Sequence, residues 1–272
     1  MINTHTPLRI TEADVAILIP VFSTPMKDLQ KFFQQILCLD TVPHIFFVYE
    51  ENSCNFDFAS MVKQCCMAKN LDYRILTMNG RRGLGFALNA AVAKIEQKFV
   101  MRHDLGDDFL ENRVDDVLQA LNSFSDVDIL YSQALLSDGN SEKSSNYPRS
   151  EKALQRAFVL GNPICHPTVV FKREAILRIG NYKPSLRFCE DLDLWLRAIS
   201  AGLRFYCVDR ETICYYLPVN GRVSSHWNAN LSVRLRNFGV PNFVYSVFGI
   251  VVVLTFIILP EALRNKVYKL VK

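Results

Sequence analysis

Short apolar runs alternate with amphipathic segments along the first two-thirds of the chain. Residues 15–22 ("VAILIPVF") form a continuous apolar run that ends at Ser-Thr-Pro, which is typical of a buried strand. Residues 26–37 then carry apolar side chains at helical spacing. The pattern repeats, with strands expected at 44–52, 72–78, 98–104 and 127–132 and helices at 58–68, 83–95 and 110–124. This alternation predicts an α/β fold with a Rossmann-like, mainly parallel mixed sheet and helices on both faces.

The later segments are less regular. Residues 135–152 are polar and are expected to form a loop. Residues 166–182 predict a strand followed by a helix that a glycine ends, and residues 189–202 predict a helix with acids in its first turn and Gly202 near its end.

Residues 240–260 contain no charged side chain. As a helix, these 21 residues would extend about 31 Å, close to the thickness of a bilayer core. The segment could span a membrane, re-enter it, lie in its plane, or be a buried core helix. The basic residues Arg264, Lys266, Lys269 and Lys272 follow it.

Composition excludes some partners. The chain has 272 residues, 50% of them hydrophobic, which is enough for a sizeable core. A net charge of +4, without basic residues interleaved with aromatics, argues against nucleic-acid binding. The eight cysteines form no C-x-x-C pair, so they are expected to be free thiols in a reducing compartment. The first apolar run is too short and too β-branched for a signal peptide, so most of the chain is expected to face the cytosol.

One acidic cluster follows an expected strand. The stretch "RHDLGDDFLENR" (102–113) places Asp104, Asp107 and Asp108 at a strand end, where α/β sheets bind ligands. Carboxylates there could hold Mg²⁺ or Mn²⁺ together with the phosphates of a nucleoside diphosphate. Asp107 and Asp108 could instead cap the helix expected from residue 110.

A second acidic cluster begins the helix expected at 189–202. Glu190, Asp191 and Asp193 fall in its first turn, where a carboxylate could act as a general base or could simply match the helix dipole. The stretch "RRGLGFALN" (81–89) also puts glycines at a helix start, where backbone N–H groups can meet an anion, although this signal alone is weak.

Together these motifs resemble the family 2 glycosyltransferases of the GT-A fold, and in particular their exopolysaccharide and lipopolysaccharide branch. The resemblance covers roughly residues 14–217 and rests on five motifs in the family's order. These are "VAILIPVFS", "GLGFALN", "RHDLGDDFLENR", "GNPICHPTVVFKREAILRIGNY" and "EDLDLWLR", the last of which is similar to E-D-x-D-L-W-x-R.

The resemblance implies a role for each matching residue. Asp191 would be the base that deprotonates the acceptor hydroxyl, and Glu190 would contact the acceptor or orient its loop. Asp104 would lie near the ribose and the metal. Gly180 and Tyr182 would shape the floor of the cleft. The implied donor-binding residues are Pro20, Glu50, Glu51, Arg82, Gly85, Asn89, Asp104, His166 and Thr168, and the implied metal ligands are Asp104, Asp107 and Asp108.

The chain departs from the family's pattern in three places. Gly106 stands where the family has its metal-binding Asp, and a one-residue slip permitted by the glycine would let Asp107 take that role. Asn112 replaces a proline before Arg113. The family's basic residue after the last strand is not evident, and neither Arg222 nor His226 is a clear replacement.

The resemblance implies an inverting, Mg²⁺- or Mn²⁺-dependent transferase that moves a sugar from a nucleotide-diphosphate sugar to a lipid-linked glycan in cell-surface polysaccharide biosynthesis. Residues 1–225 would form the GT-A domain, and residues 226–272 a membrane-associating segment with an apolar part (240–260) and a basic tail (261–272). The positive-inside rule would place the tail of a simple span in the cytosol and the transferase outside, away from its nucleotide. A re-entrant or in-plane segment at the cytoplasmic face of the inner membrane is therefore preferred.

Two rival functions remain. A sugar nucleotidyltransferase would need a glycine-rich basic loop after the first strand, which "FSTPMKD" does not provide. A degenerate, non-catalytic subunit of a polysaccharide assembly complex is suggested by Gly106.

Overall fold

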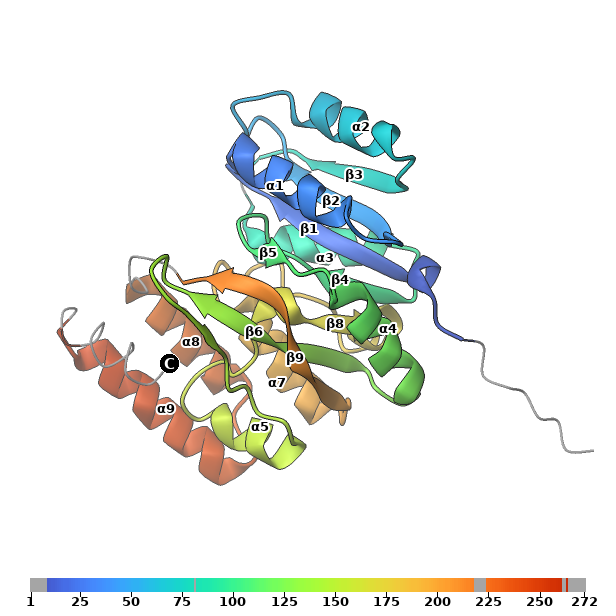
Figure 1. Ribbon diagram of the computed structural model, residues 1–272. Coiled ribbons are helices and arrows are strands. Elements are labelled where there is room, and N and C mark those ends of the chain that lie inside the picture. The colour runs from blue at the N-terminus through green and yellow to red at the C-terminus, as the bar shows by residue number, and fades with distance from the viewer. Residues whose placement is uncertain (1–8, 81, 218–223, 261–262, 264–272) are drawn as a thin grey trace, which may run out of the picture.

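One nine-stranded sheet organises the protein (Figure 1). The structure is a computed structural model that describes residues 9–80, 82–217, 224–260 and 263. The strand order is β3-β2-β1-β4-β8-β6-β9-β5, and β7 pairs with β6 outside this path.

The first half of the sheet is parallel, as the sequence predicts. Its four strands are β1 (Val15–Val21), β2 (His44–Glu50), β3 (Tyr73–Met78) and β4 (Phe99–Arg102). In register, Leu18 of β1 pairs with Phe46 of β2 on one side and with Arg102 of β4 on the other. Every residue of β1 is buried, which explains why its sequence is continuously apolar.

The second half contains both parallel and antiparallel pairs, which makes the sheet mixed, as the sequence predicts. β8 (Val170–Lys172) is antiparallel to β4 and to β6 (Ile129–Ser137), whereas β9 (Phe205–Tyr216) is parallel to β6. The chain leaves β6 and enters β8 at the same end of the sheet. It therefore runs through β8 in the direction opposite to β6, and the two strands pair antiparallel. Residues 135–152, expected as a loop, hold the end of β6 and also β7 (Glu142–Ser144).

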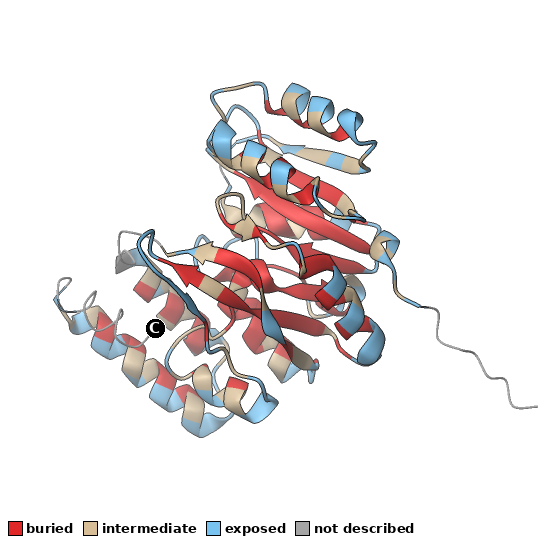
Figure 2. Cartoon of the chain, viewed as in Figure 1, coloured by how far each residue is buried: buried red, intermediate tan, exposed pale blue. Residues whose placement is uncertain are grey.

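Helices cover both faces of the sheet. The helices α1 (Met26–Ile36), α2 (Phe58–Ala68) and α4 (Arg113–Ser123) contribute to one core, which includes Phe32 and Phe47. On the other face lie α3 (Leu84–Lys94), α5 (Glu151–Ala157), α6 (Arg173–Arg178) and α7 (Glu190–Ser200), around a core that includes Trp195. Figure 2 shows the central strands buried between these layers.

The chain continues as a helical hairpin of α8 (Ser224–Arg236) and α9 (Phe243–Ile258). The rings of Trp227 and Phe256 stack between the two helices, with their centroids 4.5 Å apart. Arg234 ties the hairpin to the rest of the molecule by donating to the carbonyl of Phe158 over 2.6 Å. α9 has 16 residues, so it is shorter than the 21-residue helix considered from the sequence. Within the described ranges no helix is long and apolar enough to cross a bilayer. The basic residues of the tail lie outside them.

Candidate functional site

The carboxyl ends of parallel strands bring the first group of acids together. β2 ends at Glu50, and Asp104 follows β4 by two residues, with β1 lying between these strands. Because parallel strands end at the same edge of a sheet, both acids lie at the same edge, which is where α/β sheets commonly bind ligands.

Gly106 shapes a tight turn between Asp104 and Asp107. The N–H of Asp107 donates to the carbonyl of Asp104 over 3.2 Å, and Gly106 has φ +110°, which is a conformation that favours glycine. The turn holds the two carboxylates so close together that the negative charge of Asp104 disfavours ionisation of Asp107. Burial and that charge raise the pKa of Asp107 to about 8. The turn therefore places Asp107, rather than residue 106, beside Asp104.

Asp108 has partners of its own. Its carboxylate accepts from Gln35 over 2.9 Å and from the hydroxyl of Tyr216 over 2.9 Å, and it forms an ion pair with Lys31. Lys31 and the other two donors hold the pKa of Asp108 below its usual range despite partial burial. Asp108 begins β5 (Asp108–Phe109), which pairs with β9, so these contacts already give it a structural role, and its expected role as a metal ligand stays a prediction.

The alternative of a helix cap is also wrong for these two acids. α4 begins at Arg113, after Asn112, and the acids in its first turn are Asp115 and Asp116. Asp107 and Asp108 lie before this turn, because β5 pairs with β9 directly before residue 110, where the helix was expected to begin. The N–H of Leu110 also donates to the carbonyl of Thr212 over 3.2 Å.

Two buried arginines lie beneath the turn. Arg102 donates from Nη2 to Oδ1 of Asp104 over 2.6 Å, and Arg113 donates from Nη2 to the carbonyls of Arg102 and Pro167 over 2.6 and 2.7 Å. His103 lies between them and stacks on Phe32. Its Nδ1 is 3.1 Å from Nη1 of Arg113, a donor, so this nitrogen acts as the acceptor. Burial and both guanidinium charges lower the pKa of His103 well below its usual value.

The second group of acids begins α7. Cys189 precedes the helix with φ +60°, and Glu190 and Asp191 are its first two residues. Asp191 is half-buried: its Oδ2 accepts from Nδ2 of Asn162 over 2.7 Å, and its Oδ1 accepts from the N–H of Leu192 over 2.7 Å. Glu190 is buried, and burial together with the charge of Asp191 raises its pKa.

The two groups of acids converge. The charge of Asp104 contributes to the raised pKa of Glu190, and the charge of Arg102 opposes it. Burial raises the pKa of Tyr182, and Asp191, Glu190 and Asp104 contribute to the same shift. Asp104 of the first group and Glu190 of the second therefore lie near enough for their charges to interact, and both also interact with Arg102 and Tyr182.

The glycine-containing helix α3 supports this region from below. A Cβ added at Gly85 would lie 2.9 Å from the carbonyl oxygens of Lys183 and Leu186 and 3.3 Å from Cβ of Glu190. Asn89 donates to the carbonyl of Tyr182 over 2.7 Å, and Asn181 donates to the carbonyl of Asn89 over 2.9 Å. These contacts position the loop before α7, and the expected contact of Gly85 and Asn89 with the donor stays a prediction.

His166 and Thr168 lie in the short 3₁₀ helix His166–Thr168 and are buried. His166 Nε2 is 2.8 Å from the hydroxyl of Tyr182, and the hydroxyl of Thr168 donates to the carbonyl of Cys165 over 2.7 Å. Burial lowers the pKa of His166 well below its usual value, with a smaller effect from Arg102. Both side chains thus form part of the wall behind Tyr182.

The remaining donor-binding candidates occupy the same end of the sheet. Pro20 is buried in β1, and Glu50 is buried at the end of β2, whereas Glu51 and Arg82 are exposed. The guanidinium of Arg82 lies 4.9 Å from the ring centroid of Phe86. Their contact with a nucleotide remains a prediction.

The rest of the E-D-x-D-L-W-x-R motif fastens the loop around Gly180. Arg197 pairs with Asp193 over 2.8 Å and donates to the carbonyls of Ile179 and Asn181, each over 2.7 Å. Gly180 has φ +89°, and Tyr182 is buried directly after this loop. Asp193 and Arg197 therefore set the loop that leads to Tyr182.

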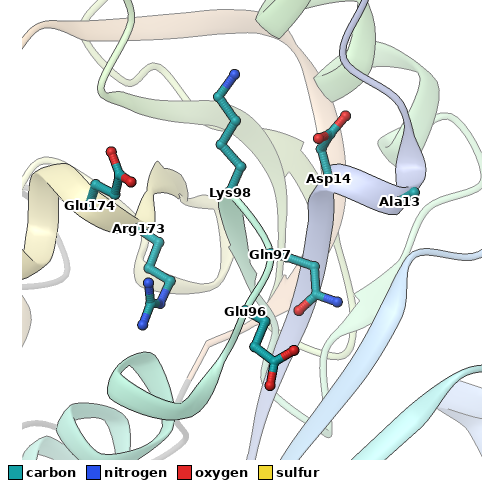
Figure 3. A pocket seen from close by; sticks show the side chains of 7 residues that line it. All are labelled: Ala13, Asp14, Glu96, Gln97, Lys98, Arg173 and Glu174. Atoms are coloured by element: carbon teal, nitrogen blue, oxygen red, sulfur yellow. The ribbon is translucent and has the colours of Figure 1, made fainter.

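A hollow of about 420 Å³ lies at the opposite edge of the sheet, before the start of β1 and β4. Figure 3 shows charged side chains around it, including Asp14, Lys98 and Arg173. Arg173 already caps α3 by donating to the carbonyl of Val92 over 2.9 Å and to that of Ala93 over 3.2 Å. The hollow lies at the opposite edge of the sheet from Asp104 and Glu50, and its Arg173 has a structural role.

Two residues of the site are absent from the sequence-based prediction. Asn162 orients Asp191, and the backbone N–H of Tyr216 donates to Oδ1 of Asp107 over 3.1 Å. Asn162 belongs to the motif that begins "GNPICHPT", so the sequence singled out this segment. Nothing in the sequence indicated, however, that Asn162 contacts Asp191. No signal in the sequence connected Tyr216 to the acidic turn.

The residues present are compatible with a divalent cation. Oδ2 of Asp107 is buried without a hydrogen-bond partner, and the carboxylate of Asp104 is partly exposed beside it. Among the described residues no group of three or more His, Cys, Asp or Glu is arranged to hold a metal. Mg²⁺ and Mn²⁺ are commonly held by one or two carboxylates plus substrate phosphates, and Asp104 with Asp107 could supply that number.

No protein-family model matches the chain. Its sequence is 29% identical to the amylovoran biosynthesis glycosyltransferase AmsE of Erwinia amylovora over 130 residues, which are 47% of this chain and 48% of that protein. It is 29% identical to an Escherichia coli UDP-Gal:alpha-D-GlcNAc-diphosphoundecaprenol beta-1,3-galactosyltransferase over 135 residues, 48% of each protein. The chain spans about half the length of these curated relatives.

Solved structures share the fold. The Staphylococcus aureus protein TarS in complex with UDP-GlcNAc has a TM-score of 0.65 at 14% identity, covering 81% of this chain and 65% of that one. The mannosyltransferase PcManGT from Pyrobaculum calidifontis, in complex with GDP-Man and Mn²⁺, has a TM-score of 0.59 at 15% identity, covering 95% and 73%. The chain thus has the mixed α/β fold of glycosyltransferase structures, and its sequence relatives are glycosyltransferases.

Proposed function

We propose that the protein is an inverting glycosyltransferase of family 2, which transfers a sugar from a nucleoside-diphosphate sugar to a hydroxyl of a growing glycan. The convergence of the Asp104–Asp107 turn with Glu190 and Asp191 carries the proposal, because this reaction needs a site for the diphosphate beside a base for the acceptor. The glycosyltransferase relatives and the shared fold support the reaction class.

Asp191 is the proposed base. It lies at the N-terminus of α7, where the helix dipole favours a negative carboxylate, and Asn162 fixes its orientation. It accepts the proton of the acceptor hydroxyl while that oxygen forms a bond to the anomeric carbon. The bond from this carbon to the diphosphate breaks, and its electron pair leaves with the nucleoside diphosphate. Attack opposite the leaving group inverts the anomeric carbon.

Glu190 has a complementary role. Adjacent acids repel one another when both are ionised, so the more deeply buried one retains its proton more readily. Glu190 is buried and its pKa is raised, whereas Asp191 is half-buried. Glu190 therefore holds a proton beside the charged Asp191 and can donate a hydrogen bond to the acceptor.

The turn between Asp104 and Asp107 is the proposed site at which the negative charge of the leaving group is stabilised. A departing diphosphate carries negative charge, and a Mg²⁺ or Mn²⁺ ion bound there would supply Lewis-acid stabilisation. Asp104 and Asp107 would hold it, and Arg102 fixes the carboxylate of Asp104 from beneath. TarS is in complex with UDP-GlcNAc, and PcManGT is in complex with GDP-Man and Mn²⁺. They support a nucleotide-sugar donor without selecting its nucleotide.

The acceptor is proposed to be a lipid-linked saccharide at the cytoplasmic face of the inner membrane, in cell-surface polysaccharide biosynthesis. The name of the E. coli relative specifies a diphosphoundecaprenol-linked acceptor for that protein, and the name of AmsE specifies amylovoran biosynthesis. The apolar residues of α9 would suit a lipid environment beside such an acceptor.

A degenerate, non-catalytic subunit is the second candidate, and the glycine at position 106 favours it. Donor screening by thermal shift with Mn²⁺ and UDP- or GDP-sugars finds the ligand first, since a ligand that binds the native state raises the melting temperature. A degenerate subunit would show no metal-dependent hydrolysis or transfer with any donor that shifts the melting temperature.

The Asp191→Asn variant then tests the base. We expect it to bind the donor as the wild type does and to lose at least 99% of turnover, in line with the roughly 10²- to 10⁴-fold contribution of general bases. Asp115→Asn is the matched control, because Asp115 is an exposed acid in the first turn of α4. Wild-type turnover in Asp191→Asn would exclude the mechanism.

A further inference from the structure

The helix α9 has two different faces. Ser246, Gly249, Val253 and Phe256 are buried and lie at helical spacing, so they form one stripe against the rest of the molecule. Gly249 lies over the guanidinium of Arg234, and a Cβ there would overlap Nη1. This stripe fixes which way α9 is turned.

The opposite stripe is exposed and apolar except for Thr255, whose hydroxyl donates to the carbonyl of Val251 within the helix over 3.0 Å. It includes Phe248, which is 58% exposed, and Ile258, which is 81% exposed. The exposed ring of Phe238 contacts that of Phe243 edge-to-face at 5.5 Å and extends the surface toward α8. We call this surface the apolar face, and its members are Leu235, Phe238, Phe243, Val244, Val247, Phe248, Val251, Leu254 and Ile258.

Positive charge is concentrated in the same part of the chain. Residues 224–272 contain six basic residues and one acid, Glu261, a net charge of +5. The whole chain carries +4, so residues 1–223 carry −1. Residues 224–260 contain no acid at all, and the exposed Arg236 lies beside Leu235 on α8. An apolar stripe with basic neighbours is the pattern of helices that lie on anionic membranes.

We propose that the apolar face lies flat on a phospholipid bilayer with anionic headgroups, with α9 in the plane of the interface. A span would require α9 to leave the body of the protein, and this would uncover Trp227 and Arg234. Phe256 of α9 stacks on Trp227 with ring centroids 4.5 Å apart, and Gly249 of α9 packs against the guanidinium of Arg234. Arg234 is buried and donates to the carbonyl of Phe158 over 2.6 Å, so this packing holds α9 against the body of the protein. As a helix of 16 residues, α9 is about 24 Å long, less than the roughly 30 Å core.

A second copy of the chain is a poorer occupant. In a two-fold dimer the same patch meets itself, so the exposed Arg236 of one copy would be brought towards that of the other. Anionic lipid would instead neutralise this charge while its acyl chains cover the apolar side chains.

Vesicle binding tests the proposal with the full chain and without any turnover, so its outcome is independent of the proposed function. We expect the protein to sediment with vesicles that contain phosphatidylglycerol and much less with vesicles of phosphatidylcholine alone. Raising the salt from about 0.1 M to about 1 M shortens the Debye length from about 10 Å to about 3 Å and should release part of the bound protein.

Two sets of variants identify the surface. The double variant Phe248→Asp, Val251→Asp should reduce vesicle binding at least tenfold, because both side chains are exposed and can be replaced without opening the core. Met67→Asp is the matched control: Met67 is 69% exposed on α2, at the far end of the molecule from α9 (Figure 1). It should leave binding unchanged, and melting temperatures should show that both proteins are folded.

Several results would overturn the proposal. One is the absence of binding to anionic vesicles at low salt, and another is full binding by the double variant. Sedimentation velocity adds a third: a dimer that the double variant converts to a monomer, without vesicle binding, would assign the apolar face to contact between copies.

Fluorescence separates an in-plane helix from a span. A tryptophan introduced as Val251→Trp should be quenched more by lipids brominated close to the headgroup than by lipids brominated near the chain ends. Stronger quenching by the deeply brominated lipids would show that α9 crosses the bilayer, which contradicts an in-plane helix.

Discussion

Asn162 and Asp191 form a directed pair: Nδ2 of Asn162 donates to Oδ2 of Asp191 over 2.7 Å. The other end of the same amide is also engaged, because its Oδ1 accepts from the N–H of Ile164 over 3.2 Å. Asn162 therefore connects the loop before η2 (His166–Thr168) to the proposed base and acts as a positioning residue.

Asn162→Asp should lower kcat about tenfold with little change in the KM for the donor. The new carboxylate still accepts from Ile164, but it offers Asp191 an acceptor in place of a donor. A hydrogen bond to a charged group is worth roughly 1.5–3 kcal/mol, and about 1.4 kcal/mol corresponds to a tenfold change in rate. Steady-state kinetics measures both constants, with Asn140→Asp in an exposed turn as the control. Equal losses in kcat and in donor affinity would instead indicate general disorder of the site.

Substitution of Asp107 should weaken Mn²⁺ binding, whereas substitution of Asp108 should not. In Asp104→Asn and in Asp107→Asn, the Mn²⁺ concentration that gives half-maximal binding in the presence of nucleotide should rise at least tenfold, since each variant removes one of two proposed ligands. Isothermal titration calorimetry, or the electron paramagnetic resonance signal of free Mn²⁺, measures this half-maximal concentration directly.

Asp108→Asn is the control for that experiment. Its side chain already pairs with Lys31, Gln35 and Tyr216, so the change should lower stability by about 1 kcal/mol and leave Mn²⁺ binding unchanged. A large loss of Mn²⁺ affinity in Asp108→Asn, with none in Asp107→Asn, would reverse the assignment.

Gly85→Ala should destabilise the protein and disturb the loop before α7. The added methyl would lie 2.9 Å from two backbone oxygens and 3.3 Å from Cβ of Glu190, and overpacking of this kind costs roughly 1–3 kcal/mol. Gly161→Ala is the control, because no atom lies within 4 Å of the added Cβ there. Urea unfolding should separate the two variants. If both are as stable as the wild type, the loop before α7 is not held by this contact.

The local features of the site follow from the sequence because they depend on short spacings. The strand that ends before Asp104 and the helix that begins with Glu190 and Asp191 both lie where their patterns predict. The positive φ of Gly106 agrees with a glycine that permits a turn between acids.

The missed features depend on contacts between distant residues. Tyr216 and Asp107 are 109 residues apart, and Asn162 and Asp191 are 29 apart, so no periodicity connects them. The start of α4 was misplaced for the same reason, since pairing of Asp108 and Phe109 with β9 overrides the local helical pattern. The antiparallel pairing of β8 with β4 and β6 likewise depends on the return path of the chain after β6.

His166→Gln should make the free energy of unfolding decrease less steeply as the pH falls below neutral. The pKa of His166 is well below its usual value of about 6.5 in the folded protein, because the imidazole is buried. Below about pH 6.5 the unfolded chain therefore binds a proton that the native state does not, and the free energy of unfolding decreases as the pH falls. Removing the imidazole should reduce this slope by up to about 1.4 kcal/mol per pH unit.

The measurement is chemical unfolding from pH 7 to pH 5, and the carboxylates common to both proteins cancel in the difference between the slopes. Tyr182→Phe is the control: it removes the hydroxyl 2.8 Å from His166 Nε2 but keeps the imidazole buried among Tyr182, Trp195 and Arg102. It should lower stability at every pH and retain the wild-type slope. If His166→Gln also keeps that slope, then the imidazole is protonated in the folded protein, and the wall behind Tyr182 must admit water.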